Sequence, residues 1–209
     1  MNKIENIIFD FGGVLYDISF ERGAKAFENL GFNPSEFPQE FLSVFRQFEN
    51  GILQPNEFIN QLQLLSDHHI TENEIVQAFN QILIGIDAYK VADLRNLKQK
   101  FNLFLLSNTN EIHFKIYSEE IKENIRTSDF YNLFVNEYYS YLLKMRKPDA
   151  SIFNFVIKDS NLDPNGTLFV DDSYENINAA ASLGLQPFWI ENADSWKKLI
   201  ELLKVNIER

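Results

Sequence analysis

The sequence predicts an α/β protein in which a Rossmann-like parallel sheet is sandwiched by helices and carries an inserted α-helical cap domain. Short apolar runs typical of buried strands alternate with helical segments over most of the chain, which indicates a parallel sheet with right-handed crossovers. Residues 19–84 break this alternation, because they show helical periodicity, contain no convincing strand and are too long for a crossover. We therefore expect an α/β core of residues 1–16 and 87–209 and a cap of residues 17–86.

The elements of the core follow from local patterns. Apolar runs predict strands at residues 4–10, 103–106, 138–141, 167–170 and 186–190. Helices are expected between them, at 88–100, after Thr109, from Pro148, at 174–183 and at the C-terminal end. Proline is favourable in the first turn of a helix, and Gly184 is a typical helix terminator.

The expected cap is a series of short helices. Aromatic side chains recur at helical spacing at Phe41, Phe45 and Phe48. Thr71 and Glu74 have the spacing of a capping box, which marks the start of a further helix. Three prolines divide the stretch into separate helices: Pro34, Pro38 and Pro55.

Composition excludes several classes of function. The net charge of −11 argues against binding to nucleic acid or to an anionic membrane through a general basic surface. The chain contains no cysteine, which excludes disulfides, thiolate catalysis and zinc–thiolate sites. It has no signal-peptide pattern and no apolar run long enough to cross a bilayer, so we expect a cytoplasmic protein. Its 20 phenylalanines indicate a well-packed aromatic core, and the oligomeric state is left open.

Polar residues that could take part in catalysis or ligand binding stand where the predicted strands end. Asp10 follows the first strand and is itself followed by Gly12 and Gly13, a tight turn with little side-chain bulk. Three further clusters stand at strand ends or helix starts: Ser107-Asn108, Lys147 and Asp171-Asp172. Each alone has an ordinary interpretation, such as a helix cap or a solvated lysine. Parallel strands end on one edge of a sheet, where ligands bind in open α/β folds, so the clusters together predict a site around Asp10.

On these residues the chain resembles the haloacid dehalogenase-like (HAD) hydrolase superfamily over nearly its whole length. The matching segments are Asp10-Phe11-Gly12-Gly13-Val14-Leu15, Ser107-Asn108, Lys147-Pro148, and Asp171-Asp172 with Asn176. The long interval between the first two motifs is similar to that of members with a helical cap inserted after the first strand. Similar Ser-Asn-Thr-Asn and Arg-Lys-Pro segments occur in sugar-1-phosphate phosphatases of the superfamily.

The resemblance implies a Mg²⁺-dependent phosphatase that hydrolyses a small phosphate monoester, with a sugar phosphate favoured, through an aspartyl-phosphate intermediate. It assigns catalysis to Asp10 as the nucleophile and to Lys147 as a fixed positive charge. Phosphate binding is implied for Ser107, Asn108, Gly12 and Gly13. The implied Mg²⁺ ligands are Asp10, the carbonyl of Gly12, Asp172 and Asp171. The expected partner is a small phosphorylated metabolite.

Gly12 departs from the usual pattern, in which an acid stands two residues after the nucleophile. Glycine keeps the metal-binding carbonyl but lacks the carboxyl group that acts as general acid and base, a loss of about 10²–10⁴-fold in rate. We therefore expect a good leaving group, such as an anomeric oxygen or a carboxylate. His113 and Asp17 are candidate substitutes, although a partly exposed helical histidine and a solvated acid are the favoured interpretations.

Other residues and functions remain open at this point. Glu49-Asn50-Gly51 is either a substrate-contacting loop or a plain turn, and Arg146 is expected to be a surface charge. A haloacid dehalogenase also lacks the second acid, but it needs no Mg²⁺ and its fourth motif is not an acidic pair. A third alternative is a catalytically weak protein that binds a phosphorylated ligand in the same pocket.

Overall fold

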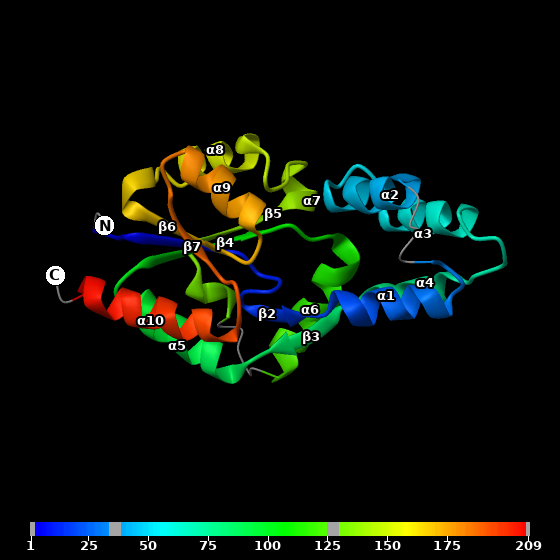
Figure 1. Cartoon of the computed structure of the whole chain (residues 1–209), viewed down its shortest axis with the longest axis horizontal. Helices are drawn as coiled ribbons and strands as arrows, with labels where there is room; N and C mark the ends of the chain where they lie inside the picture. The colour runs from blue at the N-terminus through cyan, green and yellow to red at the C-terminus, as the bar shows by residue number, and fades with distance from the viewer. Residues whose placement is uncertain (1–2, 34–38, 125–129, 208–209) are drawn as a thin grey trace.

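A computed structural model describes residues 3–33, 39–124 and 130–207 of the chain. Its main sheet has five parallel strands in the order β5-β4-β1-β6-β7 (Figure 1). The strands are β1 (Asn6–Phe9), β4 (Asn102–Ser107), β5 (Asn136–Tyr139), β6 (Thr167–Asp171) and β7 (Gln186–Trp189). The predicted α/β class with a parallel sheet is therefore confirmed, and β1, which carries Asp10 at its carboxyl end, lies at the centre.

Helices cover both faces of this sheet, as expected for a doubly covered parallel sheet (Figure 1). One face packs against α5 (Ala88–Lys98), α6 (Glu111–Asn124) and α10 (Ala193–Ile207). The other face packs against α8 (Ala150–Asp159) and α9 (Tyr174–Ser182). Short helical turns complete the core at α7 (Ser140–Leu143), η2 (Tyr131–Leu133) and η3 (Pro164–Gly166).

The two faces of the sheet follow the two-residue period of β1. Ile7 and Phe9 belong to the core on the α5–α10 side, whereas Ile8 belongs to the core on the α8–α9 side. In register with Ile8 lie Phe104 of β4 and Phe169 of β6, both in the same core. Because β1 is buried on both faces, its position and that of the carboxylate that follows it are tightly determined.

In the described residues between β2 and β3, the cap consists of α1 (Phe20–Asn29), α2 (Gln39–Glu49), α3 (Pro55–Leu64) and α4 (Glu72–Asn80). They enclose a hydrophobic cluster of their own, rich in phenylalanine, in which the rings of Phe48 and Phe58 stack with centroids 4.3 Å apart. Thr71 Oγ1 accepts a hydrogen bond from the Glu74 amide, and the Glu74 carboxylate accepts one from the Thr71 amide, which confirms the predicted capping box. Helix α3 begins at Pro55, in agreement with the prediction that this proline separates two cap helices.

Some predictions of local structure are wrong. Strands β2 (Tyr16–Ile18) and β3 (Leu83–Ile86) form an antiparallel pair at the entrance to the cap, where the sequence predicted no strand. Each is too short to show a period, and they pair only because the four cap helices return the chain to its starting point. The strand expected at 138–141 ends at Tyr139, and α8 begins at Ala150, after the N-cap residue Asp149.

Pro34 and Pro38 lie outside the described residues. None of the helices in the described ranges has the length and apolar character needed to cross a membrane.

Candidate active site

Most of the predicted site residues line one cavity of about 390 Å³ at the carboxyl edge of the sheet, whereas Gly13 and Asp171 do not line it. The core contributes Asp10, Ser107, Lys147 and Asp172 to its wall. The cap contributes further polar groups, Arg46 and Glu49 of α2. The cavity therefore lies where the core faces the cap.

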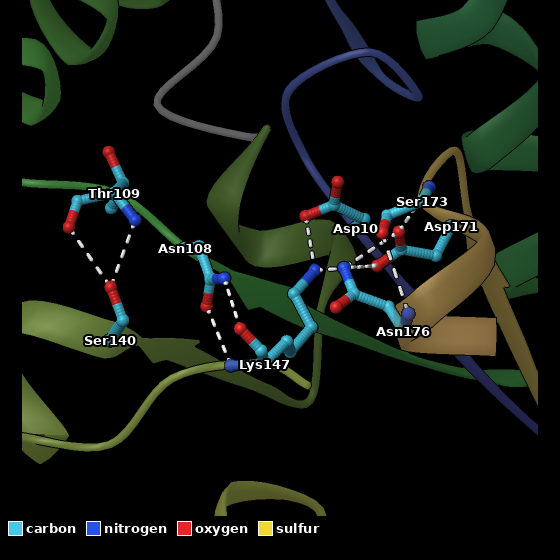
Figure 2. Close-up of polar contacts among 8 residues, drawn as sticks. All are labelled: Asp10, Asn108, Thr109, Ser140, Lys147, Asp171, Ser173 and Asn176. Atoms are coloured by element: carbon cyan, nitrogen blue, oxygen red, sulfur yellow. Dashed lines mark hydrogen bonds and ion pairs between the residues drawn. The ribbon is translucent and has the colours of Figure 1, made fainter. Parts of the chain in front are cut away.

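A buried lysine joins two of the predicted acids (Figure 2). Lys147 Nζ lies 2.5 Å from Asp10 Oδ1 and 2.8 Å from Asp171 Oδ2, and its side chain is only 1 % exposed. Burial lowers the pKa of Lys147, but the attraction of the two carboxylates outweighs it, so the pKa is held above its ordinary value. Lys147 is therefore a fixed positive charge beside the predicted nucleophile.

The carboxylate of Asp171 is occupied by partners inside the protein. Its Oδ1 accepts hydrogen bonds from the Ser173 amide at 2.8 Å and from Asn176 Nδ2 at 2.9 Å, and its Oδ2 accepts from Lys147. Figure 2 shows these donors surrounding the carboxylate. Asp172 lines the cavity, while among the described side chains none donates a hydrogen bond to its carboxylate. The two neighbouring acids thus have different surroundings.

Asn108 holds the backbone of Lys147 from the opposite side. Its Oδ1 accepts from the Lys147 amide and its Nδ2 donates to the Lys147 carbonyl, both at 2.9 Å (Figure 2). This reciprocal pair uses one of the two N–H groups of Nδ2, so the second N–H and the backbone of Asn108 remain for the phosphate contact that the sequence predicted. Ser107, at the end of β4, has a side-chain hydroxyl without a hydrogen-bond partner among the described residues. Its hydroxyl is accordingly free for a ligand.

Three acids crowd this edge of the sheet. Asp10, Asp171 and Asp172 offer oxygen atoms that lie within 4.8 Å of one another. Burial raises the pKa of Asp10 to about 7, Lys147 opposes the increase, and the other two acids add to it. Burial and the charge of Asp171 also raise the pKa of Asp172. Such a cluster has more negative charge than the single lysine neutralises.

The site has the donor set of a magnesium centre, because Mg²⁺ prefers carboxylate and carbonyl oxygens. Gly13 shapes it: at φ +81°, a Cβ on this residue would lie 2.2 Å from Asp172 Oδ2. Glycine is thus required for the turn and for the close approach of the Asp172 carboxylate. The residues present fit the metal that the sequence motifs imply.

Packing does not require glycine at position 12. A Cβ on Gly12 would meet the Ile18 side chain at 3.5 Å, which is ordinary van der Waals contact, and its φ lies outside the left-handed region. The missing carboxyl group is therefore a chemical feature of this chain and not a steric necessity.

The two candidate substitutes for that carboxyl group are occupied elsewhere. His113 Nδ1 accepts from Asn110 Nδ2, and its Nε2 donates to the Phe79 carbonyl, each at 3.1 Å. Burial lowers the pKa of His113 to about 4, so the ring is neutral and has no proton to give to a ligand. Asp17 Oδ1 lies 2.7 Å from Lys90 Nζ and forms an ion pair with it. Lys90 is buried, which the sequence did not indicate.

The expectation that Arg146 is a surface charge is wrong. Its Nη2 lies 3.1 Å from Glu49 Oε2, the side chain is 26 % exposed, and both residues line the cavity. Burial raises the pKa of Glu49, whereas Arg146 and Arg46 oppose the increase. The signals available in the sequence were the position of Arg146 next to Lys147 and the glycine after Glu49-Asn50.

Comparisons with known proteins identify the class. The family model described as haloacid dehalogenase-like hydrolase matches residues 4–184, and the chain belongs to this family. D-ribitol-5-phosphate phosphatase of Bacteroides thetaiotaomicron is 33 % identical over 205 residues, which cover 96 % of this chain and 98 % of the relative.

Solved structures agree with this assignment. A variant of a HAD family enzyme from Bacteroides thetaiotaomicron, in complex with magnesium and inorganic phosphate, is 32 % identical with a TM-score of 0.85. The match covers 94 % of this chain and 98 % of that one. A HAD-like family hydrolase from Porphyromonas gingivalis is 30 % identical, with a TM-score of 0.84 and coverage of 97 % and 98 %.

Proposed function

We propose that this protein is a Mg²⁺-dependent phosphatase of a small sugar or polyol phosphate and that it works through an aspartyl-phosphate on Asp10. The observation that carries the proposal is the buried contact of Lys147 with Asp10 and Asp171, in a cavity that Asp172 also lines. The phosphatase name of the relative and the magnesium and phosphate in the related structure support it.

The residues divide the chemistry between them. A carboxylate oxygen of Asp10 attacks phosphorus while the bond from phosphorus to the leaving oxygen breaks, and water then cleaves the resulting acyl phosphate. Lys147 keeps positive charge beside Asp10 during both steps, and Asp171 keeps Lys147 in place. The Ser107 hydroxyl and backbone amides after β4 bind phosphoryl oxygens. Bound Mg²⁺, held by Asp10, the Gly12 carbonyl and Asp172, would neutralise the repulsion between carboxylate and phosphate.

The wall of the cavity favours a hydroxylated leaving group. Arg46 and Glu49 of the cap and Arg146 of the core line the same cavity as Asp10 and offer both donors and acceptors. A cavity of about 390 Å³ lies near the lower end of the range for small-molecule sites, which suits a substrate of a few carbons. The substrate in the name of the relative, D-ribitol 5-phosphate, has this chemistry.

The identity of the leaving oxygen divides two substrate classes. Gly12 favours sugar 1-phosphates and acyl phosphates, whose leaving groups need little protonation. The relative is named for a primary alkyl phosphate, whose alkoxide leaving group needs a proton donor. Measuring the rate at which this protein hydrolyses a substrate of each class decides between them.

The test is a phosphate-release assay with D-ribitol 5-phosphate, glucose 1-phosphate and acetyl phosphate, with Mg²⁺ and with EDTA. We expect Mg²⁺-dependent release that Asp10→Asn abolishes and Asp67→Asn, an exposed acid of the cap, leaves unchanged. Chloride release from 2-chloropropionate without metal would instead establish a dehalogenase. Ligand-dependent thermal stabilisation without any turnover would establish a binding protein.

A further inference from the structure

Ser140 connects the core to the cap at a point that no sequence motif marked. It follows β5 directly and is fully buried. Its hydroxyl accepts a hydrogen bond from the Thr109 amide at 3.0 Å, as Figure 2 shows. It also lies within donating distance of two carbonyl oxygens, that of Glu49 at 2.7 Å and that of Thr109 at 3.0 Å. One hydroxyl has one proton, so it can donate fully to only one of these acceptors at a time.

On the core side, Ser140 holds the loop that follows β4. Thr109 stands directly after Asn108, whose side chain fixes the backbone of Lys147. Thr109 is itself buried, so its amide loses its hydrogen-bond partner within the described part of the protein if the Ser140 hydroxyl is removed. Ser140 therefore helps to set the loop that positions both Ser107 and the catalytic lysine (Figure 2).

On the cap side, the loop after α2 lies directly against the core. At Gly51, with φ +62°, a Cβ would lie 2.0 Å from the Tyr141 carbonyl oxygen, so the two backbones touch without room for a side chain. The Glu49 carboxylate pairs with Arg146, next to Lys147. The cap loop of residues 49–51 is thus docked on core residues 140, 141 and 146.

We propose that Ser140 is a positioning residue that couples docking of the cap loop to the geometry of the phosphate-binding loop after β4. With the cap loop docked, its proton goes to the Glu49 carbonyl at the shorter distance, and its oxygen holds the Thr109 amide. When the cap loop leaves, the proton turns to the Thr109 carbonyl, so the hydrogen bonding of the catalytic loop changes with the cap. The consequence for turnover rests on the proposed phosphatase function.

The first experiment measures amide hydrogen exchange, which does not depend on activity. In Ser140→Ala we expect exchange of the Thr109 amide to rise about 10-fold or more, since a buried donor loses its partner. We also expect Mg²⁺ and inorganic phosphate to slow amide exchange in the cap loop of the wild type. This protection should be weaker in Ser140→Ala. Ser118→Ala is the control, because Ser118 is also buried and, among the described residues, its hydroxyl donates to Lys115 of its own helix.

The second experiment is a double-mutant cycle in kcat/KM. Gly51→Ala is expected to undock the cap loop independently of Ser140, because its Cβ would clash with the Tyr141 carbonyl oxygen. We expect each single change to lower kcat/KM about 10-fold and the double variant to lose clearly less than the product of the two. Ser140→Thr restores the hydroxyl and tests rescue, and Ser140→Cys keeps the volume with a weak donor if Ser140→Ala folds poorly.

Additive losses in the cycle, or Thr109 exchange in Ser140→Ala that matches the Ser118→Ala control, would overturn the coupling. Absence of turnover in all variants together with the predicted exchange changes would refute the phosphatase and leave the coupling intact.

Discussion

Gly12 stands where the motif pattern that this chain resembles has an acid, two residues after Asp10. Its carbonyl remains available to a metal, and a Cβ on this residue would meet the Ile18 side chain at ordinary van der Waals distance. The residues that the sequence offered in place of a carboxyl group, His113 and Asp17, are held by Phe79 and Lys90. The missing acid therefore has no simple replacement among these two, and its effect can be measured directly.

Gly12→Asp is expected to raise kcat/KM for D-ribitol 5-phosphate about 10-fold or more, because it supplies the acid that an alkoxide leaving group needs. The rate with glucose 1-phosphate should change much less. Steady-state kinetics on both substrates test this, with Gly12→Ala as the control for added bulk. Equal gains on both substrates, or gains in Gly12→Ala as well, would show that Gly12 does not restrict the leaving group.

The two adjacent acids of the fourth motif should behave differently when each is changed. Asp172→Asn is expected to weaken Mg²⁺ binding about 10-fold or more, since its carboxylate is free to bind metal. Asp171→Asn should leave Mg²⁺ affinity nearly unchanged and lower kcat, because Asp171 holds Lys147. Isothermal titration with Mg²⁺ and steady-state kinetics separate the two effects. A larger loss of Mg²⁺ affinity in Asp171→Asn would reverse the assignment.

At the scale of elements, α4 of the cap and α6 of the core contact each other through the imidazole ring of His113. His113 of α6 stacks on Phe79 with centroids 3.9 Å apart and donates to the Phe79 carbonyl near the end of α4. The contact requires the neutral ring, since Nδ1 accepts from Asn110. The histidine therefore supports the junction of cap and core and does not take part in proton transfer.

This role makes stability depend on pH. The folded pKa of His113 is about 4, below the ordinary value of 6.5, so the unfolded chain binds the extra proton between these values. Stability from this group is complete above pH 6.5 and falls as the pH decreases towards 4, by up to about 1.4 kcal/mol per pH unit. Urea unfolding of wild type and His113→Gln from pH 7 to 4.5 tests the difference. Identical pH slopes would contradict it.

At the scale of the whole molecule, the protein has separate hydrophobic cores on the two faces of the sheet and in the cap. The active cavity lies between core and cap, so its shape depends on the stability of both. The cap core combines aliphatic side chains with phenylalanine rings, and the fully buried Phe58 contacts the rings of Phe45 and Phe48.

Phe58→Ala is expected to destabilise the protein by about 3–5 kcal/mol, the usual cost of removing a buried phenylalanine. Leu64→Ala, on the 84 % exposed leucine at the end of the same helix, should change stability by less than about 0.5 kcal/mol. Chemical denaturation measures both. Similar values for the two variants would show that the cap cluster contributes little.

The parallel sheet and the family could be predicted from the sequence alone, because buried strands and motif residues are recognisable in short stretches of the chain. Ile7–Phe9 is such a stretch, Asp10 follows it, and Asp171 is the last residue of β6. The folded structure was needed to find the β2–β3 pair, the burial of Lys90, the partners of Asp171 and the junction of Ser140, Glu49 and Arg146. These features depend on contacts between segments distant in the chain, and such contacts leave no local pattern in the sequence.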